Sequence, residues 1–234
     1  YPIILILLNS LKKESAITTT GVFELPLGEI WNGFTNYVAS VTQMDFLKSF
    51  WYSLVISVMS VVLILLCCSM CAWYIVRVNG LFSKILYYLC VFSMVVPFQM
   101  VMFTLAKTAD TLKLNTPYNI CIIYLGFGAG LAVFMFSGFV KSIPVEIEEA
   151  ADVDGAGPLT VLLKIYLPVS LPALATVALF AIVNHWNDYF SGLIYMSKAS
   201  MYPLQTYIQQ LTVDLTQITD ADQLKQLSAL NNRS

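Results

Sequence analysis

The densest group of charged side chains lies in residues 141–168, a polar stretch between two apolar runs. Its acidic residues are Glu146, Glu148, Glu149, Asp152 and Asp154. Pro144 suits the first turn of a helix, and carboxylates near that end interact favourably with its positive dipole. Gly155 is a good residue to end the same helix. The pattern predicts a short acidic helix that stops at Gly155.

This predicted helix has one apolar face. Ile147, Ala150 and Ala151 recur at positions i, i+3 and i+4, which makes a narrow stripe containing two small side chains. A short amphipathic helix outside the bilayer either docks in a groove of a partner protein or lies on the membrane surface. Anionic lipid would repel the carboxylates, so the pattern favours docking to a partner.

A second group of polar side chains closes the last apolar run of the sequence: Asn184, His185, Asn187 and Asp188. Polar groups within a membrane span indicate a functional site by default. The alternative is that the chain has emerged into the interface, where Trp186 and Tyr189 would be anchors. Both interpretations stay open, and His185, the only histidine, is expected to be an interfacial residue.

Pro97 and Gln99 lie within another apolar run, where they predict either a kink with a pore-lining amide or ordinary packing. Cys68 and Cys71 have the spacing C-x-x-C, but no second pair or histidine cluster accompanies them, so no metal site is expected. The sequence lacks the G-x-x-x-x-G-K-[ST] phosphate loop, so energy from ATP would have to come from another chain.

The elements that position these residues follow from the composition. The chain has 234 residues, 58% hydrophobic and 11% charged, with a mean hydropathy of +0.75. A soluble domain has about 25% charged residues, so lipid is the expected surrounding of the excess apolar surface. Runs long enough to span a bilayer are Phe50–Val76, Ile85–Ala106, Pro117–Val140, and Val169–Val183 continuing into His185 and Trp186. Backbone polar groups must be paired in lipid, so the predicted fold class is all-α, a polytopic transmembrane helix bundle.

The remaining segments complete the predicted organisation of a single transmembrane domain, residues 1–234. Tyr1–Leu8 resembles the last turns of an earlier helix, and residues 14–48 a cap loop outside the cell. Residues 197–234 form a polar segment on the same side as that cap, and residues 141–168 lie on the opposite side. The loops carry similar numbers of basic residues, so the positive-inside rule leaves the orientation open.

At this point the residues resemble a known family. Glu149-Ala150-Ala151, Gly155, Ile165 and Leu167-Pro168 match the signature EAA-x3-G-x9-I-x-LP of ATP-binding-cassette (ABC) import permeases. Val96-Pro97-Phe98-Gln99, the run Leu112–Thr116 and Trp186-Asn187-Asp188-Tyr189 are similar to patterns of the carbohydrate (maltose and multiple-sugar) permeases. The resemblance places residues 141–168 in the cytoplasm.

The resemblance implies a type I ABC importer permease of six helices, with a final span beyond this sequence. The residues expected to couple it to an ATPase are Glu149, Ala150, Ala151, Asp154, Gly155, Ile165, Leu167 and Pro168. The candidate translocation path is Pro97, Gln99, Asn184, Trp186, Asn187 and Asp188. No catalytic residue and no cofactor is expected in this chain, because ATP and Mg²⁺ would bind the ATPase.

The implied partners are a second, homologous permease, two ABC ATPase subunits and an extracellular solute-binding protein, all at a bacterial plasma membrane. An importer for a polyamine, phosphate or amino acid remains the alternative within this class. A secondary transporter would need buried charges in mid-span and an inverted repeat, and a membrane enzyme would need a catalytic set. The sequence shows neither pattern.

Overall fold

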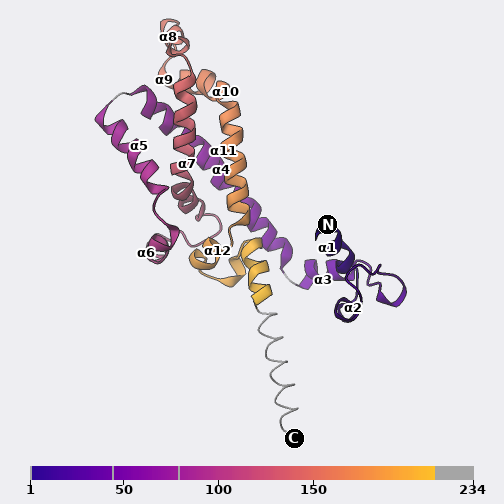
Figure 1. Ribbon diagram of the computed structural model, residues 1–234. Coiled ribbons are helices and arrows are strands. Elements are labelled where there is room, and N and C mark those ends of the chain that lie inside the picture. The colour runs from indigo at the N-terminus through magenta and orange to yellow at the C-terminus, as the bar shows by residue number, and fades with distance from the viewer. Residues whose placement is uncertain (1, 44, 79, 214–234) are drawn as a thin grey trace. The chain divides into compact units, whose positions relative to one another are not determined.

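The computed structural model describes residues 2–43, 45–78 and 80–213 (Figure 1). The chain divides into two compact units, residues 1–50 and residues 51–234. Among the described residues the regular structure is helical, and the only pairing of strand type is an isolated bridge between Lys12 and Trp31.

The first unit contains α1 (Pro2–Ser10), α2 (Glu14–Thr19), the short 3-10 helix η1 (Gly28–Ile30) and α3 (Thr35–Gln43). Lys12 is fully buried, and its ammonium group donates to the carbonyl of Gly21 at 3.0 Å. The Asn36 amide donates to the carbonyls of Ser10 and Lys12 at 2.8 and 2.9 Å. Much of the segment predicted as a cap loop is therefore a folded unit held by side chain to backbone hydrogen bonds.

Two helices in the described part of the chain are each long and apolar enough to cross a membrane. They are α4 (Phe46–Arg77) and α7 (Cys121–Ser142), with 32 and 22 residues and best-window hydropathies of 2.8 and 1.9. At 1.5 Å per residue both exceed the hydrocarbon core, which is about 30 Å thick. The first and third predicted spans are confirmed as helices.

The second predicted span, Ile85–Ala106, is wrong as one continuous helix. The structure has α5 (Leu81–Ser93) and α6 (Phe98–Thr111), bent by 106° at the break between them. Pro97 is the residue before α6, with ψ at 135°. Proline lacks an N–H group and disfavours helical geometry in the residue before it, so the apolar run breaks here. The pair passes the span criterion only as a broken span or a re-entrant loop.

The chain after α7 forms a series of short helices before the last long one. These are α8 (Val145–Val153), α9 (Pro158–Val161), the π-helical segment η2 (Leu162–Tyr166), α10 (Leu167–Val169) and α11 (Leu171–Asn187). The helical run that begins at Pro158 continues through Pro168 to Val169. Pro168 lies in the first turn of α10, where a missing N–H needs no partner. A bend of 74° then leads into α11.

The described chain ends with α12 (Phe190–Tyr195), the 3-10 helix η3 (Ala199–Met201) and helical residues 204–213. The polar segment predicted over residues 197–234 therefore lies partly outside the described residues.

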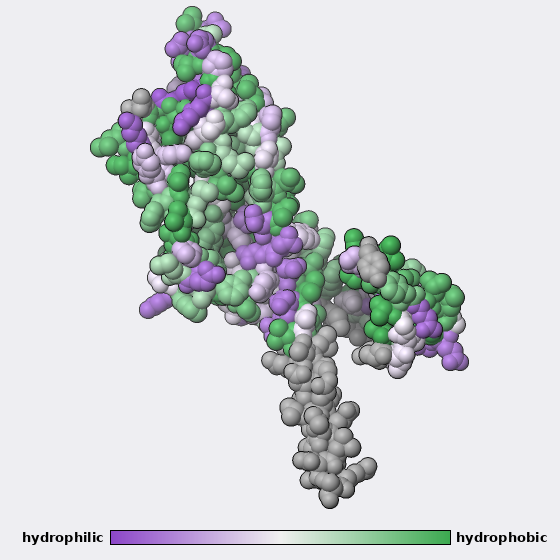
Figure 2. Space-filling view, viewed as in Figure 1, coloured by the Kyte–Doolittle hydropathy of each residue, from purple (hydrophilic) through white to green (hydrophobic). Residues whose placement is uncertain are grey.

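The core of the second unit lies between α4, α7 and α11. Ile64, Ala72 and Phe136 are fully buried there, and Val177 and Ala181 of α11 complete the cluster. Large apolar side chains face outward elsewhere, and Figure 2 shows a mostly hydrophobic surface between the α8 end and the α12 end of this unit. Such a surface suits lipid contact and is costly in water.

Candidate functional site

Helix α8 has well-defined ends. Pro144 precedes its first residue, and Glu146 and Glu148 lie in its first turn. Gly155 has a φ of +81°, and its N–H donates to the carbonyl of Asp152, while the N–H of Ala156 donates to that of Ala151. These two bonds form a Schellman motif, in which a residue in the left-handed region ends the helix. The predicted acidic helix that stops at Gly155 is confirmed.

Most of α8 is open to its surroundings, and Figure 1 shows it beyond the ends of α7 and α11. Val153 is 87% exposed and Ile147 42% exposed, so two apolar side chains stand free of the core. Of the residues expected to couple to an ATPase, some are exposed (Glu149, Ala150, Asp154, Gly155 and Pro168) and the others half-buried (Ala151, Ile165 and Leu167). An exposed face that combines apolar and acidic residues suits a protein groove with basic edges.

The acidic residues of α8 are not equivalent, because Glu148 points inward and is only 8% exposed. Its carboxylate accepts from Nε of Arg77 at 2.8 Å and from the Trp73 indole at 3.3 Å, both on α4. Sequence reasoning grouped Glu148 with the other carboxylates. The signal that could have separated it is the i, i+4 pair of Trp73 and Arg77, which places two donors on one face at the end of an apolar helix.

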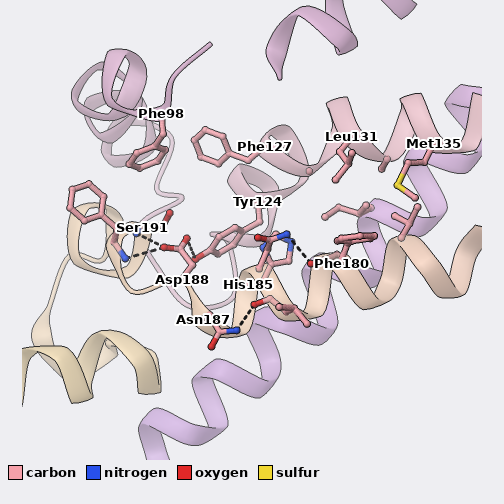
Figure 3. Close-up of a pocket in the computed structure, with 18 residues that line it drawn as sticks. Phe98, Tyr124, Phe127, Leu131, Met135, Phe180, His185, Asn187, Asp188 and Ser191 are labelled. Carbon is pink, nitrogen blue, oxygen red and sulfur yellow. Dashed lines mark hydrogen bonds between the residues drawn. The ribbon is translucent and has the colours of Figure 1, made fainter. Parts of the chain in front are cut away.

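A cavity of about 630 Å³ lies beside α11 (Figure 3). Its walls come from α4, α6, α7, α11 and α12. One part is apolar and aromatic, with Phe98 and Phe127 in contact at a ring separation of 5.3 Å. Polar side chains from the end of α11 line another part: Asn184, His185, Asn187 and Asp188. The volume falls in the range of small-molecule sites, about 300–1,000 Å³.

Asp188 organises the polar part of this cavity. Its Oδ2 accepts from the Tyr124 hydroxyl at 2.9 Å, and its Oδ1 accepts from the backbone N–H groups of Phe190 and Ser191 at 2.9 and 3.1 Å. The carboxylate thus ties α7 to the start of α12. Burial and the nearby Asp188 charge raise the pKa of Tyr195 to about 12, so this phenol stays protonated at neutral pH.

His185 is buried within the protein, with 9% of its surface exposed. Its ring lies 4.5 Å from that of Tyr124, and Nε2 has no hydrogen-bond partner within the described part of the chain. Packing against Tyr124 buries the ring within the helices, and the expected place of His185 at the membrane interface stays a prediction. A buried nitrogen without a hydrogen-bond partner is costly to the stability of the fold.

The residues predicted for the translocation path divide into two groups. Asn184, Asn187 and Asp188 line the cavity, whereas Pro97, Gln99 and Trp186 do not belong to its lining. Because α6 begins at Phe98, that ring and not the neighbouring amide of Gln99 faces the cavity. The side-chain amides of Asn184 and Asn187 donate to carbonyls four residues earlier on α11.

Comparison with known proteins gives a consistent result. Residues 65–221 match the family described as the inner membrane component of binding-protein-dependent transport systems. The chain is 31% identical over 207 residues to the probable starch degradation products transport system permease protein AmyC of Thermoanaerobacterium thermosulfurigenes, covering 88% of this chain and 74% of AmyC. It is 33% identical over 163 residues to the multiple sugar-binding transport system permease protein MsmG of Streptococcus mutans, covering 68% of this chain and 58% of MsmG.

Among solved structures, the chain resembles one in the crystal structure of a bacterial ABC transporter involved in the import of the acidic polysaccharide alginate. The TM-score is 0.80 and the sequence identity 28%, and the similarity covers 92% of this chain and 75% of that one.

Proposed function

Because the chain belongs to the inner-membrane components of binding-protein-dependent transport systems, we propose that it forms part of the channel of an ATP-driven importer for a sugar or oligosaccharide. As a member of this family it is a multi-pass permease subunit of the bacterial inner membrane and not an enzyme. Its transport system includes an ATPase and a substrate-binding protein.

The observation that carries the proposal is α8, a short helix outside the bundle that bears the signature Glu149-Ala150-Ala151 and ends at Gly155. We assign α8 as the helix that seats in a cleft of the ATPase. The small side chains permit close approach, the exposed Ile147 and Val153 supply apolar contact, and Glu149 supplies charge. Ile165, Leu167 and Pro168 lie in the segment between α8 and α11.

The assembly we propose has this chain, a second homologous permease and two ATPase subunits in the cytoplasm, with a binding protein on the outer side. ATP and Mg²⁺ bind the ATPase subunits. Closure of the ATPases would draw the coupling helices together and switch the bundle from inward-facing to outward-facing. Such a switch couples energy to transport only when the two states differ in affinity for the sugar or its binding protein.

We also propose that the cavity beside α11 is this chain's part of the translocation path. Aromatic walls with a few convergent polar groups suit a sugar, since its C–H faces lie on rings and its hydroxyls need donors and acceptors. Phe98, Phe127 and Phe180 offer the rings, while the side chains of His185 and Asn184 in the cavity wall offer polar contacts. A sugar substrate also agrees with the starch products and multiple sugars in the names of the two relatives.

The test is affinity purification of the full-length protein in mild detergent from its native cells, followed by mass spectrometry of the proteins that come with it. The expected set is an ABC ATPase, a second permease and a solute-binding protein, and the binding protein is then screened against sugars, polyamines, phosphate and amino acids by thermal shift. Stabilisation by a sugar supports the proposal, and stabilisation by another class of solute overturns the substrate. Recovery of the chain without an ATPase, even after crosslinking near Ala151, would favour an ion-driven transporter.

A further inference from the structure

The cytoplasmic end proposed for α4 and the helix α8 are joined by a compact group of polar contacts, which we call the Glu148 cluster: Trp73, Arg77, Ile143 and Glu148. The guanidinium group of Arg77 is shared between two acceptors. Its Nε and Nη2 both lie 2.8 Å from Oε1 of Glu148, and Nη2 also donates to the carbonyl of Ile143 at 3.1 Å. The indole N–H of Trp73 donates to the other carboxylate oxygen of Glu148, Oε2.

These contacts link the end of α4 to two consecutive elements, at the end of α7 and the start of α8, more than 60 residues further along the chain. Trp73 and Arg77 are one turn apart on α4, Ile143 ends α7, and Glu148 lies in the first turn of α8. The Arg77 and Glu148 side chains are only 15% and 11% exposed. A charge pair shielded from water in this way is weakly screened and strongly directional.

Apolar packing closes the cluster from the side of η2. Ile143, Leu162 and Tyr166 are buried together, and Trp73 packs against them. The cluster therefore holds α8 against the end of α4. Moving α8 away would separate the Glu148 carboxylate from its donors in a buried environment, which is costly.

We propose that Glu148 is a positioning residue which fastens the coupling helix α8 to the end of α4, so that displacement of α8 by an ATPase moves α4 as one body with it. This inference rests on the proposed function of α8. It assigns to Glu148 a role different from that of its neighbour Glu149, whose exposed carboxylate is available to the ATPase. Helix α4 also contributes Ile64 to the cavity, so its movement reaches the proposed translocation path directly.

The experiment measures whether α8 and α4 move together in the complete transporter. Spin labels are placed at Val145 of α8 and Met70 of α4, both exposed, after the five native cysteines are replaced by alanine. The complex with its ATPases and second permease is reconstituted in nanodiscs, and the distance distribution is recorded by pulsed electron paramagnetic resonance without nucleotide and after trapping with ATP and vanadate. The wild-type distance is expected to stay unchanged between the two states.

Glu148→Gln removes the charge and is expected to broaden the distribution and shift it on trapping. Trp73→Phe is a milder change that removes one donor, and we expect it to shift the distance distribution less. This variant is used instead if the Glu148→Gln protein does not fold. Asp152→Asn is the matched control, because Asp152 is exposed one turn along α8, and its distribution should equal the wild type.

The outcomes separate this inference from the proposed function. A wild-type distance that changes on trapping, or a Glu148→Gln complex that behaves as the wild type, overturns the role of the Glu148 cluster. Failure of the wild-type chain to bring down any ATPase overturns the proposed function itself, before any distance is measured.

Discussion

At the scale of the residue, the cavity is organised by a few buried polar contacts. Asp188 uses both carboxylate oxygens within the bundle, on Tyr124 and on the start of α12. Asp188 therefore holds α7 and the start of α12 together, whereas His185 Nε2 is buried without a hydrogen-bond partner in the described chain. The sequence marked both residues as polar at the end of a span, but only the position of Tyr124 shows which of them is already satisfied.

Tyr124→Phe tests this division. The change removes a donor to a carboxylate within the bundle, and such bonds contribute about 1.5–3 kcal/mol, so the purified protein should unfold at a lower temperature. Tyr195→Phe is the control, because the Tyr195 hydroxyl is buried without a partner in the described chain and its loss should be neutral or stabilising. Thermal unfolding in detergent, followed by tryptophan fluorescence, measures both. Equal melting temperatures for Tyr124→Phe and the wild type would contradict the assignment.

Gly155→Val tests the end of α8. A side chain in the left-handed region costs roughly 1–2 kcal/mol, and the site has open space for a Cβ, so backbone strain is the only expected fault. We expect less ATPase to co-purify and transport to fall, with membrane insertion intact. Gly157→Val is matched to it, since Gly157 is equally open but has extended backbone geometry with φ at −73°. Loss of the ATPase from both variants would show that bulk rather than conformation matters.

At the scale of the element, the apolar runs predicted the helices well, but they did not predict where a helix is interrupted. α4 and α7 agree with the predicted spans because uninterrupted apolar sequence in lipid leaves the backbone no alternative to a helix. The sequence left open whether Pro97 kinks a continuous span or only packs within it, and the structure instead breaks the helix there. The acidic helix α8 was predictable from Pro144 and Gly155. The inward direction of Glu148 was not, because it depends on where the end of α4 lies.

The contact between α5 and α7 gives a prediction at this scale. A Cβ at Gly130 would lie 2.7 Å from the carbonyl oxygen of Cys90 and 2.6 Å from Met94 Cγ, so Gly130→Ala forces the helices apart. Overpacking of this kind costs about 1–3 kcal/mol, and the melting temperature should fall. On the same helix Gly126 has open space, so Gly126→Ala should be neutral or stabilising through helix propensity. Equal melting temperatures for the two variants would contradict the close contact between α5 and α7 at Gly130.

At the scale of the whole molecule, a set of apolar helices carries one exposed acidic helix beyond its end. The family signature indicates the function class, and the cavity beside α11 fits a path for a sugar. Both features would work in transport only together with the partner proteins. Further surfaces for partners lie on the first unit, residues 1–50, and on the described end of the chain. The sequence does not identify those partners. The central claim is that α8 is the contact with an ATPase.

Site-specific photo-crosslinking tests this claim most directly. A photoreactive amino acid is placed at Val153, the most exposed apolar side chain of α8, and for comparison at Leu112, an exposed residue that follows α6. The full-length protein is irradiated in native membranes, and the adducts are identified by mass spectrometry. We predict an ABC ATPase adduct at Val153 and none at Leu112. An ATPase adduct at Leu112, or adducts at Val153 with lipid alone, would contradict the claim.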